Sequence, residues 1–248
     1  MNLNKSKKAL ILAAGLGTRL APITDRVPKS LVPVNGKPIL MKQIENLYQN
    51  EITDITIVSG YKAAVLEHVV HEKYPEIHII ESVDYATTNN MYSAYLAIRS
   101  MFPDGDISGF YMMNADVFFD ASVITSLRDD PATDAIVVDI GRYIEESMKV
   151  VENNGRLTAI SKMISPEAAL GSSIDVYKFS AEGGTAFYQR CCEYIEGKKE
   201  LKLWSEVALN DALADVRFQA CPLNGRWLEI DNHEDLAAAE ALFSKALL

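Results

Sequence analysis

An apolar strand that runs straight into a glycine-rich loop constrains this chain more than any other feature. Residues 9–14 are apolar without interruption, and they lead into Gly15-Leu16-Gly17-Thr18-Arg19. Lys29 follows ten residues after the arginine of that loop. Because glycines allow backbone N–H groups to approach a polyphosphate closely, and because two cations can neutralise its charge, this segment predicts a nucleoside triphosphate site. A simple strand-to-loop turn with surface cations is the alternative that the spacing leaves open.

Two better-known phosphate loops do not match this segment. A P-loop requires Lys and then Ser or Thr after its second glycine, but the nearby Gly36-Lys37 pair is followed by Pro38. A dinucleotide-binding loop requires a third glycine where Leu20 stands and an acidic residue about 20 residues later. The nearest acid, Asp25, comes far sooner. The loop therefore belongs to neither class.

Apolar segments with strand character alternate with amphipathic segments through the first half of the chain. Such alternation is typical of an α/β fold, and we predict a Rossmann-like, mostly parallel sheet with helices on both faces. The expected strands cover residues 8–13, 54–59, 77–81, 108–114 and 134–140. The expected helices cover residues 38–49, 62–73 and 91–102, with Asn89 or Asn90 as the N-cap of the last.

The pattern changes after Gly141, where a β-hairpin is indicated. Segments 148–152 and 156–160 are separated by Asn153-Asn154-Gly155, and Asn-Gly readily adopts the positive φ of tight hairpin turns. The other expected elements are strands at 173–179, 216–221 and 226–230 and helices at 182–196, 204–214 and 233–246. We therefore expect one domain over residues 1–248, with a small inserted lobe at 141–225.

Charge and cysteine content exclude several classes of protein. The chain has 24 Lys and Arg against 34 Asp and Glu, and this formal net charge of −10 disfavours a nucleic-acid partner. Cys191, Cys192 and Cys221 lack the spacing of a metal site and are expected to be reduced thiols, which suits a cytoplasmic protein. The apolar stretch 9–16 is too short to span a membrane, so we predict no membrane anchoring.

The motifs around the glycine-rich loop resemble a known family. Residues 12–20 (LAAGLGTRL), 28–34 (PKSLVPV) and 37–40 (KPIL) are similar to the N-terminus of the nucleotidyltransferases that make NDP-sugars and CDP-alcohols. Residues 88–97 (TNNMYSAYLA) and 227–232 (WLEIDN) resemble the branch of CTP:phosphocholine and 2-aminoethylphosphonate cytidylyltransferases. The resemblance runs from about residue 7 to the C-terminus and is weaker between about 130 and 225.

The resemblance implies an Mg²⁺-dependent cytidylyltransferase that joins CMP from CTP to a small phosphorylated or phosphonylated acceptor and releases pyrophosphate. Such an acceptor is largely ionised near neutral pH, because the second pKa of a phosphate monoester is about 6, so no general base is needed. Catalysis then consists of positioning and charge neutralisation. Arg19 is expected at the β- and γ-phosphates, and Lys29 is expected near the α-phosphate, where charge develops in the transition state.

Nucleotide and metal are expected at the carboxyl ends of the strands. Mg²⁺ prefers oxygen ligands, and the resemblance gives Asp116 and Asp231 as metal ligands, with Glu229 in support because it shares a strand face with Asp231. The alternative for both aspartates is a role as helix N-caps. Together with Arg19 and Lys29 they make the predicted catalytic set. The predicted nucleotide-binding residues are Leu12, Ala13, Ala14, Gly15, Leu16, Gly17, Thr18, Arg19, Lys29, Gly60, Ser82 and Asn90.

The lobe at 141–225 is expected to face the acceptor, whose ammonium group would bind aromatic faces and a carboxylate. Tyr92 and Trp204 are the predicted acceptor-binding aromatics, with Tyr143 as a further wall. Lys149 is predicted to bind an acceptor phosphate or carboxylate. The candidate counter-ions are Glu145, Glu146, Asp175 and Glu206. Each of these residues has an ordinary alternative in the core or on the surface.

Two other functions stay open. A sugar-1-phosphate nucleotidyltransferase is the first, although such chains commonly carry a longer sugar-binding insertion. A catalytically inactive, nucleotide-binding relative is the second, and the presence of the whole catalytic set argues against it. The sequence also leaves open the identity of the acceptor, the preference for CTP over UTP, and assembly as a homo-oligomer.

Overall fold

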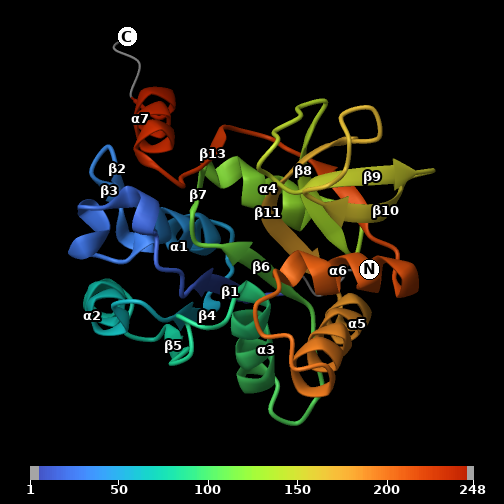
Figure 1. Cartoon of the computed structure of the whole chain (residues 1–248), viewed down its shortest axis with the longest axis horizontal. Coiled ribbons are helices and arrows are strands. Elements are labelled where there is room, and N and C mark those ends of the chain that lie inside the picture. The colour runs from blue at the N-terminus through green and yellow to red at the C-terminus, as the bar shows by residue number, and fades with distance from the viewer. Residues whose placement is uncertain (1–5, 245–248) are drawn as a thin grey trace.

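A twisted central sheet organises the molecule, and its strands run in the order β10-β9-β11-β6-β1-β4-β5 (Figure 1). The computed structural model describes residues 6–244. Strand β8 pairs with β11, and β12 pairs with β8, which completes nine strands. The bounds of these strands are β1 (Lys8–Ala13), β4 (Asp54–Ser59), β5 (His78–Glu81), β6 (Phe110–Asn114), β8 (Ala135–Ile140), β9 (Lys149–Asn153), β10 (Arg156–Ser161), β11 (Gly171–Phe179) and β12 (Gln219–Pro222).

The parallel half of the sheet is buried on both faces. Strands β1, β4, β5 and β6 run parallel to one another. Because successive side chains of a strand point to opposite faces, β1 contributes to two separate cores. Leu10 and Leu12 pack on the side of α3 (Asn90–Met101), α5 (Ala181–Cys192) and α6 (Ser205–Asp215). Ala9 and Ile11 pack on the opposite side, against α1 (Ile39–Gln49), α2 (Ala63–Lys73) and α4 (Ala121–Asp129). The predicted Rossmann-like sheet with helices on both faces is thus confirmed.

The antiparallel half of the sheet contains the predicted hairpin. Asn154 and Gly155 have φ values of 51° and 71°, as the two central residues of a type I′ turn require. The hairpin does not stand apart, because β9 pairs with β11 and so extends the central sheet. Helix α5 continues as a π-helical turn at Glu193–Gly197, and α6 packs against α5 and β10.

A third, smaller core joins the two ends of the chain. Two short strand pairs, β2 (Pro33–Val34) with β3 (Lys37–Pro38) and β7 (Val117–Phe119) with β13 (Trp227–Glu229), lie beside α7 (His233–Leu242). In Figure 1 the red helix α7 lies next to the blue β2–β3 pair. Their shared core contains Leu20, Val32, Val34, Ile39, Phe118, Ile230, Leu236 and Ala239. This packing fixes the segment after the glycine-rich loop against the segment that follows β13.

The structure decides between the two predicted N-caps of α3. Asn89 caps the helix, since its side chain accepts a hydrogen bond from the Asn90 amide. Helix α7 ends at Leu242, and residues 245 and 246 of the expected helix lie outside the described residues. All three cysteines are free thiols. Over residues 6–244, every helix is too short or too polar to cross a bilayer.

Candidate active site

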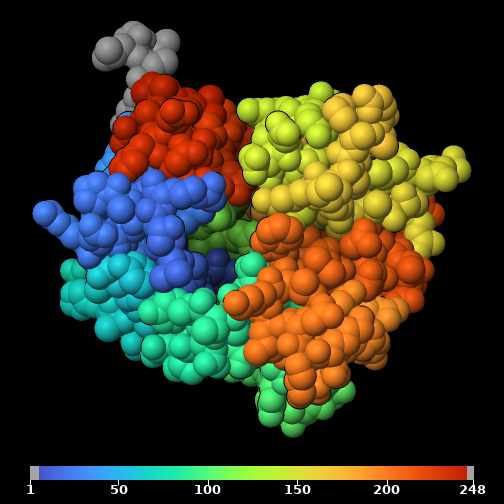
Figure 2. All heavy atoms as spheres, in the orientation of Figure 1, coloured from blue at the N-terminus to red at the C-terminus, as the bar shows by residue number. Residues whose placement is uncertain are grey.

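A pocket of about 270 Å³ opens where the carboxyl ends of β1 and β6 face the start of α6. Figure 2 shows the hollow between the blue N-terminal segment and the orange residues near 200. Six carboxylates but only two basic side chains, Arg19 and Lys162, line this pocket among the described residues. The acids are Asp116, Glu146, Asp175, Glu206, Glu229 and Asp231. Such a surplus of negative charge suits ligands that bring cations with them.

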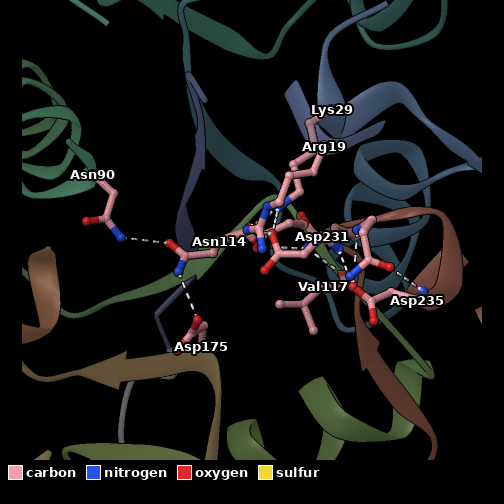
Figure 3. A network of polar contacts seen from close by, with 11 residues as sticks. Arg19, Lys29, Asn90, Asn114, Val117, Asp175, Asp231 and Asp235 are labelled. Atoms are coloured by element: carbon pink, nitrogen blue, oxygen red, sulfur yellow. Dashed lines mark hydrogen bonds and ion pairs between the residues drawn. The ribbon is translucent and has the colours of Figure 1, made fainter. Parts of the chain in front are cut away.

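Two cations and two acids from distant segments meet at one wall of this pocket (Figure 3). The Lys29 ammonium donates to Asp116 Oδ2 at 2.8 Å and to Asp231 Oδ1 at 2.6 Å. The Arg19 guanidinium lies 2.9 Å from the same Asp231 oxygen. Although burial would lower the pKa of Lys29, the two carboxylates outweigh it and raise that pKa above its ordinary value. Lys29 therefore stays charged, and the four predicted catalytic side chains form one connected cluster.

Gly17 makes room for the lysine in this cluster. It adopts φ = 62°, and a Cβ at this position would come within 2.6 Å of Lys29 Cβ. The stem of Lys29 thus passes directly over the backbone of the glycine-rich loop. A side chain at residue 17 would push the ammonium away from the carboxylates, which explains why the loop requires glycine here.

The interpretation of the two aspartates as helix caps does not fit the structure. Asn232, not Asp231, is the N-cap of α7, and it forms a capping box with Asp235. Asp116 stands between strands β6 and β7, where no helix begins. Both carboxylates are instead directed to the cationic side chains, so their positions reflect the pocket rather than helix capping.

Glu229 completes a group of three carboxylates. Asp116, Glu229 and Asp231 each offer an oxygen, and these atoms lie within 4.8 Å of one another. Asp116 Oδ1 is buried and has no hydrogen-bond partner within the protein. An unpartnered buried carboxylate oxygen beside two further carboxylates fits a hard divalent cation such as Mg²⁺, which prefers oxygen ligands.

Divalent cations should bind this group more tightly as the pH rises. Burial, followed by the charges of Asp116, Asp175 and Asp231, raises the pKa of Glu229 to about 9. At pH 7 its carboxyl group therefore holds a proton that a metal ion must displace, so we expect Mn²⁺ affinity to rise about tenfold from pH 7 to pH 8. Titration calorimetry at the two pH values, with Glu229→Gln as the control that loses this slope, measures the effect. Equal affinities at both pH values would contradict it.

Asp175 and Glu206 form a second acidic group in the lining of the same pocket. Tyr177 Oη lies 2.9 Å from Asp175 Oδ1 and 2.9 Å from Glu206 Oε1, although it has a single proton to donate. Asp175 adopts φ = 58° at an irregularity in β11, and this bend turns its carboxylate into the pocket. Burial, together with the charges of Glu206 and Asp116, raises the pKa of Asp175 to about 8. This pair lacks a cationic partner among the described residues, and so it is suited to receive one.

Two asparagines connect the Asp175 carboxylate to the neighbouring helix starts (Figure 3). Asn114 Nδ2 donates to Asp175 Oδ2 at 3.1 Å, and its own Oδ1 accepts from Asn90 Nδ2 at 3.5 Å. Asn90 Oδ1 in turn accepts from the backbone amide of Ser205 at 2.8 Å. The end of β6, the start of α3 and the start of α6 are therefore fixed relative to one another by side chains that line the pocket.

Most of the predicted residues lie in or directly beside the pocket. Gly60 packs so closely that a Cβ there would come within 2.7 Å of the Ala14 carbonyl and of Tyr85 Cβ. Ser82 is fully buried and its hydroxyl has no partner within the protein. Ala13 is buried, and Leu16, Gly17 and Thr18 continue the loop outside the pocket wall. The predicted residues that line the pocket are Leu12, Ala14, Gly15, Arg19, Asn90, Asp116, Trp204, Glu229 and Asp231.

Two predicted acceptor residues do not reach the pocket. Lys149 is fully buried and donates to the Glu145 carbonyl at 2.7 Å, with its ammonium 5.0 Å from the Tyr143 ring centre. The three residues that precede β9, Glu146, Ser147 and Met148, line the pocket instead. Tyr92 stacks on Tyr95 beside the pocket and is not part of its lining. Neither Lys149 nor Tyr92 lines the pocket, so the acceptor site proposed below does not include them.

The structure also adds residues that sequence reasoning missed. Asn114 and Tyr85 line the pocket, as does Lys162, which follows β10. The Lys162 ammonium lies 5.1 Å from the centre of the Trp204 ring, and Trp204 is about half exposed. A single lysine after a hairpin strand has no distinctive sequence signal, since such residues are usually solvated.

The fold and this cluster define a nucleotidyltransferase. A model of the nucleotidyl transferase family matches residues 8–152, and the chain belongs to that family. The resemblance found in the sequence is thus confirmed.

Individual relatives narrow the similarity further. The chain is 42% identical over 109 residues to the choline-phosphate cytidylyltransferase of Streptococcus pneumoniae, and the matched segment covers 44% of each of the two chains. It is 39% identical over 90 residues to the 2-aminoethylphosphonate cytidylyltransferase of Lancefieldella rimae, or 36% of either chain. These matched segments span less than half the length of these curated relatives. Among solved structures, the CTP:phosphocholine cytidylyltransferase LicC of Streptococcus pneumoniae has a TM-score of 0.80 at 26% identity, covering 96% of this chain and 99% of that one.

Proposed function

We propose that this protein is an Mg²⁺-dependent cytidylyltransferase, which transfers CMP from CTP to a small phosphorylated or phosphonylated acceptor and releases pyrophosphate. The main support for this proposal is the contact of the Lys29 ammonium with both Asp116 and Asp231 beside the glycine-rich loop. The similarity to choline-phosphate and 2-aminoethylphosphonate cytidylyltransferases supports the choice of nucleotide. We place the protein in the cytoplasm as part of the same proposal, because its cysteines are free.

The reaction is an in-line displacement at the α-phosphorus. An ionised oxygen of the acceptor attacks phosphorus, and the bond to the bridging oxygen of pyrophosphate breaks, so no proton has to be removed. Arg19 and the amides of the glycine-rich loop would bind the β- and γ-phosphates, and Lys29 would stabilise the charge that develops at the α-phosphate. Asp116, Glu229 and Asp231 would hold Mg²⁺, which supplies further neutralisation of phosphate charge when bound.

The base of the nucleotide would lie against the carboxyl end of β1 and the start of α3. Gly60 allows Ala14 and Tyr85 to pack closely at this point, because a Cβ at position 60 would collide with the Ala14 carbonyl. Tyr85 lines the same side of the pocket. Preference for cytosine over uracil rests on the similarity to cytidylyltransferases rather than on a contact in this chain.

The acceptor would be bound by the lobe at 141–225, and we propose that it carries a primary ammonium group. Asp175 and Glu206 offer buried oxygen acceptors, and N–H donors of a primary amine can satisfy them, whereas a trimethylammonium group has none. Trp204 supplies one aromatic face rather than a cage. Among the described residues, no carboxylate forms an ion pair with Lys162. Its ammonium would bind the phosphate or phosphonate group of the acceptor.

The variant Asp175→Asn tests the ammonium site. We expect kcat/KM for 2-aminoethylphosphonate to fall about 30- to 100-fold, because the bound ammonium would favour the ionised carboxyl group of Asp175 and asparagine cannot ionise. Ethylphosphonate, which lacks the amine, serves as the matched control and should lose less than about threefold. Initial rates of pyrophosphate release with both acceptors measure the difference. An equal loss with the two acceptors would show that Asp175 acts on the pocket in general and not on the amine.

A pyrophosphate-release screen tests the function as a whole. The four nucleoside triphosphates are combined with phosphocholine, 2-aminoethylphosphonate and glucose-1-phosphate, and we expect turnover with CTP and an amine-bearing acceptor. A sugar-1-phosphate nucleotidyltransferase is the second candidate, because a mannose-1-phosphate guanyltransferase of Candida glabrata is 25% identical over 97% of this chain. Turnover with a sugar phosphate alone would select that candidate. No turnover with any pair would select the inactive relative.

A further inference from the structure

Lys29 occupies two of the three carboxylates that the proposed metal ion would need. Its ammonium donates to Asp116 Oδ2 and Asp231 Oδ1 at 2.8 and 2.6 Å, and its side chain is only 14% exposed. The contact with Gly17 fixes the stem of the lysine on one side. Lys29 is thus held as a resident cation within the acidic group, and its transfer to another partner breaks both of these contacts.

We propose that Lys29 gates the metal site, so that a divalent ion is bound tightly only when a nucleotide's phosphates draw this lysine away. The inference rests on the proposed function. Carboxylate oxygens that accept short, charge-assisted hydrogen bonds from an ammonium are poor ligands for a second cation, because both compete for the same lone pairs and the two cations repel. Phosphate oxygens offer the ammonium an equivalent partner and leave Asp116 and Asp231 to the metal.

Arg19 reinforces the same competition at one oxygen. Its guanidinium lies 2.9 Å from Asp231 Oδ1, the oxygen that also accepts from Lys29. The Arg19 side chain is 65% exposed and can swing toward the phosphates at small cost, whereas Lys29 is confined. Lys29 therefore determines the coupling between metal binding and nucleotide binding, whereas Arg19 simply moves to the phosphates when the nucleotide binds.

A different arrangement makes the opposite prediction. Metal could use Asp116 Oδ1, which has no partner, together with Glu229, while Lys29 stays in place. In that case Lys29 would weaken metal binding only by repulsion, and to the same extent with and without nucleotide. The two arrangements differ in the coupling between metal and nucleotide, which is measurable.

The experiment measures Mn²⁺ dissociation constants by water proton relaxation, with and without a saturating CTP analogue whose α–β link resists cleavage. Wild type, Lys29→Met and Lys162→Met are compared. Lys162→Met is the matched control, because it removes one positive charge from the pocket lining without removing a partner of the three carboxylates, and no acceptor is present in either measurement. Lys29→Gln is a second variant, in case Lys29→Met does not fold by circular dichroism.

Without the analogue, we expect Lys29→Met to bind Mn²⁺ about tenfold more tightly than wild type. The increase in Mn²⁺ affinity that the analogue produces should be smaller than in wild type by a similar factor. Lys162→Met should change both quantities by less than about threefold. If Lys29→Met binds Mn²⁺ no more tightly than the control, or if its coupling equals that of wild type, the gate is refuted and the proposed function stands. If no variant binds Mn²⁺ even with the analogue, the metal site and the gate are both refuted.

Discussion

Asp116→Asn should abolish nucleotidyl transfer, with kcat/KM falling by at least about 10³-fold, while the protein keeps its fold. Asparagine has the same shape but no charge, so it cannot serve as an anionic metal ligand. The loss also leaves Lys29 with Asp231 as its one remaining carboxylate partner within residues 6–244, which changes the charge next to the α-phosphate. Initial rates of pyrophosphate release measure the effect, and circular dichroism checks the fold.

Asp120→Asn is the control for this substitution. Asp120 lies four residues further along the chain, after β7, and its carboxylate pairs with Arg226 at 2.9 Å outside the pocket. This variant should lower stability slightly and keep turnover within about threefold of wild type. Near-normal activity of Asp116→Asn would contradict its role as a metal ligand.

Lys29→Met should lower kcat by about 10²- to 10³-fold, with a smaller effect on KM for CTP. Stabilisation of charge that appears only in the transition state is expressed in kcat, whereas an interaction made equally with bound CTP would appear in KM. Steady-state kinetics at saturating acceptor separate the two. A raised KM with unchanged kcat would mean that Lys29 merely holds the nucleotide, and the proposed position beside the α-phosphate would be wrong.

Much of the fold could be predicted because the first half of the chain has strong local signals. Residues 9–13 are apolar and residues 54–59 are rich in β-branched residues, and the two segments become β1 and β4 with the expected bounds, since parallel strands buried on both faces are rich in such residues. The Asn-Gly turn predicted the hairpin for an equally local reason. In contrast, strand β7 has three residues and pairs with β13, more than 100 residues away, so no local pattern indicates it.

The site residues also differ in how well the sequence predicts their positions. Arg19 and Lys29 belong to short motifs, and Asp116 and Asp231 follow apolar strands, so their meeting at one sheet edge could be expected. The position of Asp175 depends on an irregularity within β11, and that of Lys149 depends on the register of β9 by a single residue. Side-chain direction at such points is decided by long-range pairing, which the sequence does not reveal.

A crystal structure with Mg²⁺ and a CTP analogue that resists cleavage tests the central claim most directly. We predict that the triphosphate lies along residues 15–19 and that Lys29 contacts the α-phosphate. The metal ion should bind both the phosphates and the carboxylates of Asp116 and Asp231. A nucleotide bound elsewhere, or a metal ion remote from these two aspartates, would contradict it.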